Sequence, residues 1–390
     1  MKRLIVAVVL LVPVISVTRA QDTPVPQLAN LIRANETFGR RLLAELHAGA
    51  LEKNVVISPI GVSISFAPIS YASYDNETLR EIDKVFGWER TSDIALSSRM
   101  LLARFNDDNN KIATRFVFRK GAAISADFLK VIKRDFGVEY QVAEDTTTQK
   151  HAPSQGYDFS FAPPKTEGKS KNNFWVMNRT DLDARWSGNT FVMGKTKLDD
   201  FTLGAGTVKR TSMLVSELSM YEYVKTPEFE LIRLNCGSAY VVLVLPAPDK
   251  SIQDLEKRLA DGTMLADGKL PKAVGDVEVP EFHLQYEVNL RPVLEAMGIS
   301  RVFTHMDSLL GLSPAGAMLQ DFSQKVDMKF DKEGIHAHAF TLGGGIAGGI
   351  MGGGPPPFHM VCNRPFLFLI RDDYTDSLLF AGVVVDPSKN

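Results

Sequence analysis

The chain has 390 residues, 45% of them hydrophobic, and a formal net charge of −2. This length supports a sizeable core, and the small net charge argues against a general nucleic-acid surface. After the N-terminal segment, no stretch reaches the roughly 20 apolar residues that a membrane span needs. We therefore expect a soluble protein with no nucleic-acid and no membrane partner.

The first 20 residues have the pattern of a secretory signal peptide. Lys2 and Arg3 precede an apolar run that is too short to span a bilayer, and the small residue Ala20 ends it. We expect cleavage before Gln21 and a secreted, extracellular protein. The tripeptides that begin at Asn35 and Asn76 are glycosylation sequons, and we predict that both asparagines are modified.

Periodic apolar residues and turn signals predict alternating helices and mostly antiparallel strands. No repeat and no linker divides the chain, so we expect a single α+β domain over residues 21–390. Helices are expected at 28–46, from 58 onward, at 76–86, 92–106 and 125–136, from 251 onward and at 290–297. Strands are expected at 111–119, 138–142, 174–178, 213–223, 228–235, 240–245, 277–282, 324–330 and 365–370.

The stretch from 143 to 172 cannot form one long helix, because it contains three prolines and two glycines. In the strand that follows, alternate positions carry three charged residues: Arg179, Asp181 and Asp183. A strand face with three charges favours contact with water. We therefore expect this face to be polar and solvated.

Motifs for enzymatic chemistry are missing from the sequence. It has no phosphate-binding glycine loop with a lysine, no GxSxG and no HExxH, so we expect neither an enzyme nor a cofactor. His336 and His338 lie two residues apart, but no third ligand is evident, and we expect no metal. Cys236 and Cys362 favour two buried thiols, with a disulfide as the alternative.

A long connection near the C-terminus joins two predicted core strands, the one that ends at Phe330 and the one that begins at Pro365. Eight of the twelve residues from Gly343 to Gly354 are glycine, and three prolines follow. Such a segment is neither helix nor packed core. Connections longer than about 12 to 15 residues are usually either functional or disordered.

The residues around this connection resemble a known family. The run MVCNRPFLFLI, Met360 to Ile370, is similar to the C-terminal motif of the serpins, the serine protease inhibitor superfamily. Asp331 to Gly334 resembles the acidic hinge of that family, and landmarks at Asn54–Pro59 and Leu379–Pro387 agree. The resemblance implies three mostly antiparallel sheets, about eight or nine helices and an exposed reactive-centre loop at about 334–360. The helix that normally covers the main sheet, around 143–172, is expected to be disrupted or missing.

The resemblance also implies a function. In serpins a protease cleaves the loop, and the freed N-terminal part inserts into the main sheet as a new strand, which traps the enzyme. By this resemblance the hinge comprises Glu333, Gly334, Ile335, Ala337 and Ala339, and Ile346, Ile350 and Met351 form the candidate scissile region. Opening of the sheet would be controlled by Ser58, Asn178, Trp186 and Gln324. The distal loop lacks Arg and Lys, so the expected partner of the monomer is an elastase-like or chymotrypsin-like extracellular protease.

Several departures from the inhibitory pattern support an alternative. Ile335 is bulky for the first inserted position, and His336, His338 and Phe340 would point outward from the inserted strand. Five glycines, from Gly343 to Gly349, would oppose insertion by about 3–5 kcal/mol. Gln324 replaces a usual histidine, and Gly61 replaces a small hydroxyl residue. The alternative is a non-inhibitory serpin that acts as a binding, carrier or substrate-like module.

Overall fold

A computed structural model describes residues 26–89, 94–106, 110–143, 172–187, 190–191, 196–204, 206–262, 264, 270–336 and 356–389. Three predicted features lie outside these residues. They are the signal peptide, the disrupted helix between 144 and 171, and the glycine-rich part of the loop between 337 and 355.

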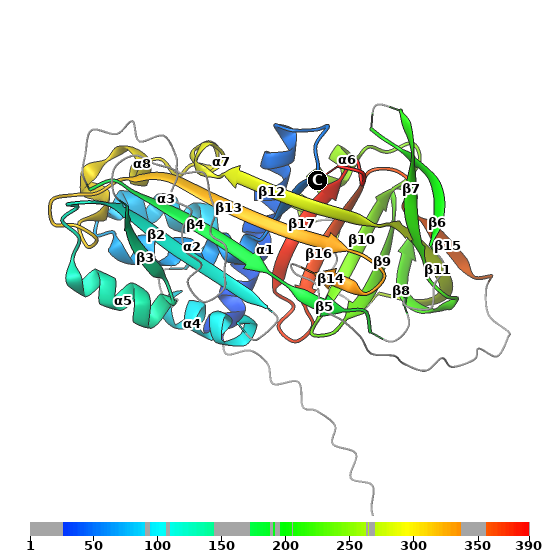
Figure 1. Ribbon diagram of the computed structural model, residues 1–390, viewed down its shortest axis with the longest axis horizontal. Coiled ribbons are helices and arrows are strands. Elements are labelled where there is room, and N and C mark those ends of the chain that lie inside the picture. The colour runs from blue at the N-terminus through cyan, green and yellow to red at the C-terminus, as the bar shows by residue number, and fades with distance from the viewer. Residues whose placement is uncertain are drawn as a thin grey trace, which may run out of the picture.

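The described residues form eight α-helices and one 3-10 helix around two sheets (Figure 1). The helices are α1 (Pro26–Ala48), α2 (Pro59–Ala72), α3 (Asn76–Phe86), α4 (Ile94–Phe105), α5 (Ala126–Phe136), α6 (Ile252–Ala260), α7 (Arg291–Met297), α8 (Arg301–Thr304) and η1 (Met306–Leu309). Side-chain caps fix several starts: Ser58 caps α2, Asp75 caps α3 and Ser125 caps α5.

The smaller sheet has seven strands in the order β3-β2-β4-β13-β14-β5, with β12 paired to β13. Its strands are β2 (Lys111–Arg119), β3 (Glu139–Ala143), β4 (Phe174–Asp181), β5 (Asp183–Arg185), β12 (Phe282–Asn289), β13 (Leu319–Phe330) and β14 (Gly334–His336). Two neighbouring pairs are parallel, β2 with β3 and β4 with β13.

The larger sheet has ten strands in the order β1-β17-β16-β10-β9-β8-β11-β7-β6, with β15 paired to β11. They are β1 (Val55–Ile57), β6 (Lys197–Thr202), β7 (Val208–Val215), β8 (Ser219–Lys225), β9 (Phe229–Cys236), β10 (Ala239–Pro246), β11 (Lys272–Pro280), β15 (Phe358–Val361), β16 (Phe366–Asp372) and β17 (Leu378–Val384). Two of the three expected sheets are continuous here, because β11 pairs with β8 through its first half and with β7 through its second. The α+β fold class is confirmed.

Helix α2 lies in the middle of the core. It is apolar on nearly every side, as expected for a helix with no solvent-facing stripe, and it contacts α1, β4 and β17. Phe66 of this helix packs against Phe86 of α3 and Phe322 of β13, with ring centroids 4.9 and 5.8 Å apart. The helix thereby supports the strands of the seven-stranded sheet from behind.

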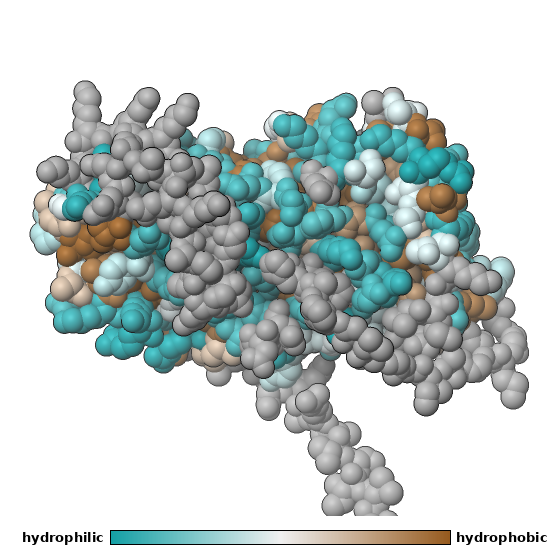
Figure 2. All heavy atoms as spheres, viewed as in Figure 1, coloured by the Kyte–Doolittle hydropathy of each residue, from teal (hydrophilic) through white to brown (hydrophobic). Residues whose placement is uncertain are grey.

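Hydrophobic residues reach the visible surface in separate patches between hydrophilic ones (Figure 2). Tyr140 and Val142, on the edge strand β3, are about half exposed. Of the helices that the structure describes, none combines the length and the apolar content that a bilayer crossing requires.

The expectation of a solvated charged face was wrong for Arg179 and Asp181 of β4, whereas Asp183 of β5 is half-buried. Arg179 and Asp181 are buried, with only 5% and 8% of their surfaces exposed, and the Arg179 Nε donates to both Asp181 oxygens at 2.9 and 3.0 Å. Two opposite charges two residues apart lie on the same face of a strand and can therefore pair. The charges are neutralised by one another and not by bulk water.

The predicted glycosylation of Asn35 is also wrong for the folded chain. Asn35 lies within α1 and is 1% exposed, and its Nδ2 donates to the carbonyl of Leu378 at 2.9 Å while its Oδ1 accepts from Ser63. A glycan has no room at this position. Asn76 is exposed at the first residue of α3, and its modification stays a prediction.

Candidate functional site

The candidate site is the seam of the seven-stranded sheet, which we define as the line where β13 meets β4 and its continuation β5 (Figure 1). In the closed half of the seam, β13 pairs directly and in parallel with β4, from Leu319 opposite Phe174 to Lys325 opposite Arg179. In the hinge half, β14 lies between β13 and β5 and is antiparallel to both. The seam therefore joins two strands in its closed half and three strands in its hinge half.

A tight turn leads from β13 into β14. The Asp331 carboxylate accepts hydrogen bonds from the backbone N–H groups of Glu333 and Gly334, at 2.9 and 3.2 Å. The Asp331 N–H in turn donates to the Gly334 carbonyl at 3.0 Å. An aspartate that bonds the backbone two residues on favours such a turn. Lys329 forms an ion pair with Asp331 at 2.6 Å, which raises the pKa of the lysine.

Trp186 holds this turn from the other side of the seam. Its indole Nε1 donates to the Asp331 carbonyl at 2.8 Å, and its backbone N–H donates to the Glu333 carbonyl at 3.3 Å. Its ring packs edge-on against Phe191 and Phe330, with centroids 5.2 and 4.9 Å away. The structure thus places Trp186 at the hinge residues and not beside the other three residues expected to control sheet opening.

Two hinge residues fit the space between the strands closely. A Cβ atom on Gly334 would lie 2.2 Å from the Ala184 carbonyl oxygen, so only glycine is tolerated there. Ile335 is fully buried, opposite Phe330 on one side and Ala184 on the other. The bulk that suggested overpacking is therefore accommodated at this first position.

A buried polar network joins the strands in the closed half. Gln324 of β13 donates from Nε2 to Asn178 Oδ1 of β4 at 2.8 Å and to the Ser58 carbonyl at 2.9 Å. Its Oε1 accepts from the Ser58 N–H at 2.9 Å. Asn178 Nδ2 donates to the Ala113 carbonyl of β2 at 3.2 Å. Ser58, Asn178 and Gln324, predicted from sequence, are thus brought together, and the glutamine satisfies three partners at once.

Gly61 explains how the network is packed. A Cβ atom at this position would lie 2.4 Å from the Thr180 Oγ1 and 2.5 Å from the Asn178 Oδ1. The glycine allows the first turn of α2 to approach β4, and the Thr180 hydroxyl donates to Asn178 at 3.3 Å. The sequence marked Gly61 as unusual, but the role of Thr180 depends on a tertiary contact that no local pattern reveals.

The other predicted site residues are only partly placed. Ala337, Ala339 and the candidate scissile residues Ile346, Ile350 and Met351 lie outside the described residues, as do His338 and Phe340. His336 ends β14. Cys236 and Cys362 are buried and unpaired, which confirms the preferred interpretation. Burial raises the pKa of Cys236 to about 12 and raises that of Cys362 as well, so both stay protonated thiols at neutral pH.

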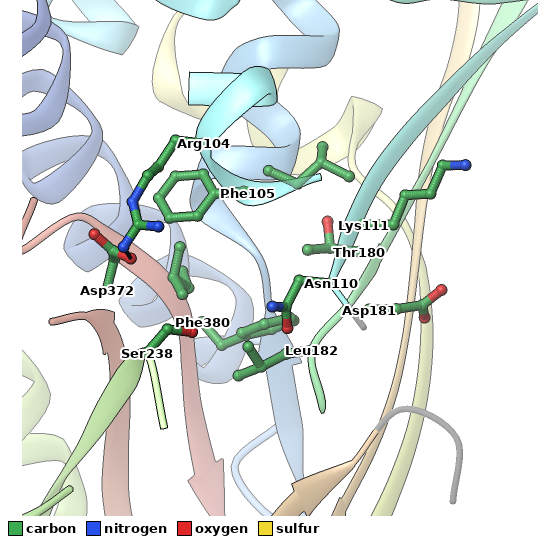
Figure 3. Close-up of a pocket in the computed structure, with 12 residues that line it drawn as sticks. Arg104, Phe105, Asn110, Lys111, Thr180, Asp181, Leu182, Ser238, Asp372 and Phe380 are labelled. Atoms are coloured by element: carbon green, nitrogen blue, oxygen red, sulfur yellow. Dashed lines mark hydrogen bonds and ion pairs between the residues drawn. The ribbon is translucent and has the colours of Figure 1, made fainter. Parts of the chain in front are cut away.

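A small pocket lies near the end of β4 (Figure 3). The Arg104 guanidinium and the Asp372 carboxylate face each other at one end of it, 3.1 Å apart. Polar and apolar groups both contribute to its wall: Arg104, Phe105, Asn110, Lys111, Ile112, Thr180, Asp181, Leu182, Ser238, Asp372, Leu379 and Phe380. Its free volume is about 30 Å³, which is room for about one water molecule and not for a small-molecule ligand.

Comparison with known proteins gives a consistent result. The family described as "Serpin (serine protease inhibitor)" matches residues 33–387. The chain is 25% identical over 382 residues to Serpin A12 of Mus musculus, covering 92% of this chain and 88% of the relative. It is also 25% identical over 414 residues to Iripin-8 of Ixodes ricinus, covering 95% and 97%.

Solved structures share the fold. Serpin48 of the insect Tenebrio molitor aligns with a TM-score of 0.76 at 18% identity, covering 92% of this chain and 98% of that one. Human thyroxine-binding globulin, solved in complex with thyroxine, aligns with a TM-score of 0.75 at 19% identity, covering 93% and 100%. Neighbours in structure thus include a protein named for the ligand it binds.

Proposed function

Because the chain belongs to the serpin family of serine protease inhibitors, we propose that it inhibits a serine protease by cleavage and insertion of its own loop. The protease would cut the segment between β14 and β15, and the part that follows β14 would then enter the seam. Insertion must outrun hydrolysis of the acyl bond to the enzyme. The protein itself supplies no catalytic group and acts as a substrate that traps its enzyme.

The observation that carries this proposal is the position of β14. Its three residues already continue the hydrogen-bonded ladder between β13 and β5, with Ile335 opposite both neighbours. The next residues of the chain, from Ala337 onward, would extend this strand into the closed half once β4 and β13 separate. A parallel pair would thereby become two antiparallel pairs, which are slightly more stable per residue.

The closed half sets the resistance to insertion. β4 and β13 must separate, so the Gln324 Nε2 to Asn178 Oδ1 bond, the side-chain bond that links them directly, must break. A buried donor or acceptor left without a partner costs about 1–3 kcal/mol. Gln324 also holds the Ser58 cap of α2, so opening would disturb the helix behind the sheet. This network would therefore oppose the separation of β4 and β13.

The proposal also includes where the protein acts and which kind of protease it inhibits. Residues 1–20 would direct the chain out of the cell, where the target protease acts. The absence of Arg and Lys between Gly343 and Pro357 favours an elastase-like or chymotrypsin-like enzyme, with cleavage near Ile346, Ile350 or Met351. We propose that the inhibitor is a monomer.

The test is incubation of the full chain with pancreatic elastase and with chymotrypsin. We expect a covalent complex that survives SDS and has the summed mass of the protease and the N-terminal fragment of the cleaved chain, because the C-terminal fragment leaves as the amine product. The cleaved chain alone should melt at a higher temperature than the intact one, because the sheet has gained a strand.

A pair of loop variants tests whether formation of the complex requires insertion of the cleaved loop into the sheet. Ile335 faces the interior, so in an extended strand Ala337 would face inward and His338 outward. Ala337→Asp should convert the inhibitor into a substrate, cleaved at the same bond without a complex. His338→Asp should still form the complex. Complexes of equal yield from both variants would contradict insertion.

A second candidate function is a non-inhibitory binding or carrier role. It is favoured by the glycines at 343–349, which oppose strand formation. Clean cleavage by both proteases, with no complex and an unchanged melting temperature, would support this role and exclude the first.

A further inference from the structure

The strand that follows the loop carries a cluster of metal-ligating side chains. β15 is short and pairs in parallel with β11, which places His359 opposite Asp276 and Val361 opposite Glu278. Asp276 and Glu278 are two residues apart, so their side chains share one face of β11. The three side chains can each direct one nitrogen or oxygen so that all three atoms lie within 4.8 Å of one another.

His359 lies between the two carboxylates. Its Nδ1 is 2.6 Å from Asp276 Oδ2, a hydrogen-bond distance, and its Nε2 is 3.7 Å from Glu278 Oε1, which is too long for a hydrogen bond. The Glu278 side chain is only 6% exposed, whereas that of His359 is 55% exposed. One side of the imidazole is therefore fixed by Asp276, and the other faces a buried carboxylate across a gap.

Lys197 of β6 neutralises part of the cluster. Its ammonium is 2.7 Å from Glu278 Oε2 and 3.0 Å from Asp199 Oδ2. Three carboxylates and one ammonium leave a net charge of −2 when the imidazole is neutral. Lys197 binds the Oε2 atom of Glu278, which leaves Oε1 directed at His359.

We propose that Asp276, Glu278 and His359 form a binding site for a divalent transition-metal ion, with Zn²⁺ as the ion of best fit. Nε2 and Glu278 Oε1 are the direct ligands. Two ligands on a tetrahedral zinc, with bonds of about 2.0–2.1 Å, lie about 3.3 Å apart. A small rotation of the exposed imidazole closes the present gap to that spacing.

The arrangement of Asp276 matches what zinc-binding histidines require. A histidine that ligates a metal usually donates its other ring N–H to a carboxylate, which fixes the tautomer and the ring orientation. Asp276 already accepts in this way from Nδ1. The imidazole ligand favours zinc over calcium and magnesium, which prefer oxygen ligands alone. Water would complete the coordination.

The metal would act at the C-terminal end of the loop, where the chain enters β15. It would join His359 of β15 to Glu278 of β11, so the point at which the loop re-enters the ten-stranded sheet becomes fixed. This role does not depend on protease inhibition, and the site can be tested without any protease.

The test is calorimetric titration of the metal-free full chain with ZnCl₂. We expect one site on the wild-type chain and at least tenfold weaker binding by His359→Gln. Asp276→Asn should weaken binding about 10- to 100-fold, the usual effect of losing a histidine's supporting carboxylate. Lys197→Met should bind more tightly than wild type, because a competing cation is removed from Glu278.

A matched control is His283→Gln. His283 Nε2 lies 2.6 Å from Asp327 Oδ1 on β12 and β13, and the nearest further partner of that carboxylate is the uncharged Gln285. Zinc affinity should be unchanged in this variant. Zinc should raise the melting temperature of wild type and not that of His359→Gln, while the two melt alike without zinc. Equal zinc affinity of wild type and His359→Gln, or no binding by wild type, would overturn the proposal.

Discussion

The two halves of the seam are held by different kinds of interaction. In the hinge half, the fully buried Ile335 of β14 lies opposite Phe330, and the Trp186 ring packs edge-on against Phe330. In the closed half, the directional network of Ser58, Asn178 and Gln324 joins β13 to β4 and to α2. Apolar burial grows gradually with buried area, whereas a hydrogen-bond network is either satisfied or broken. For the proposed loop insertion, the difference places the barrier in the closed half, because only there must β4 and β13 separate.

The largest expected effect comes from removing the anchor of the hinge half. Trp186→Ala deletes a large buried ring, and we expect a loss of about 3–5 kcal/mol of unfolding free energy. The turn at Asp331 also loses the indole donor, so β14 should detach. Hydrogen exchange of peptides that cover 329–336 should accelerate, and the melting temperature should fall.

Trp186→Phe is the matched control for this prediction. It keeps an aromatic ring near Phe191 and Phe330 but removes the Nε1 bond to the Asp331 carbonyl. We expect a smaller loss than for alanine and intermediate exchange at the turn. Unchanged exchange at 329–336 in the alanine variant would show that Trp186 does not hold the hinge.

The next largest effect should come from opening the closed half. Gln324→Ala removes the three bonds to Ser58 and Asn178, and we expect a loss of about 1–3 kcal/mol because buried polar groups lose their partner. Hydrogen exchange should accelerate in β4 and β13 while the turn at Asp331 keeps its protection. This pattern of exchange would show that the two halves of the seam are stabilised independently.

Two further variants sharpen the comparison. Gln324→His restores a donor between the strands and should recover part of the lost stability. Gln285→Ala removes a glutamine on β12 that donates to Asp327 in an exposed position, and it should be close to neutral. Equal losses of unfolding free energy from Gln324→Ala and Gln285→Ala would mean that the buried network does not hold β4 and β13 together.

Much of this site could be predicted from the sequence because its parts lie in short, ordered patterns. The resemblance to the serpins assigned Asp331 to Gly334 to the hinge and marked Gln324 as the position of a usual histidine. The fold class followed from alternating helical and strand periods. These features are local, and each is set by a few neighbouring residues.

Two of the misses depend on contacts between distant segments, and the third depends on a pair of residues in one strand. The sequon at Asn35 could not reveal that the same side chain bonds Leu378, which is 343 residues away. The charges of β4 were expected to need water, whereas Arg179 and Asp181 satisfy each other inside the protein. His359 came next to Asp276 only through the pairing of β15 with β11.

The smallest expected effect tests the charge pair at the hinge turn. Lys329 is half exposed and pairs with Asp331 at 2.6 Å, so Lys329→Met should cost about 0.2–1 kcal/mol at pH 8, less at high salt. Because folding raises the pKa of Lys329, this stability is complete below the ordinary lysine pKa of about 10.4 and is lost as the pH rises through the folded value. The difference in melting temperature between wild type and Lys329→Met should therefore shrink above about pH 10.

Lys332→Met is the control, since Lys332 and Glu333 are exposed and 3.6 Å apart, and it should leave stability unchanged at both pH values. A difference between wild type and Lys329→Met that persisted undiminished at pH 11 would assign the effect to packing of the lysine stem and not to its charge.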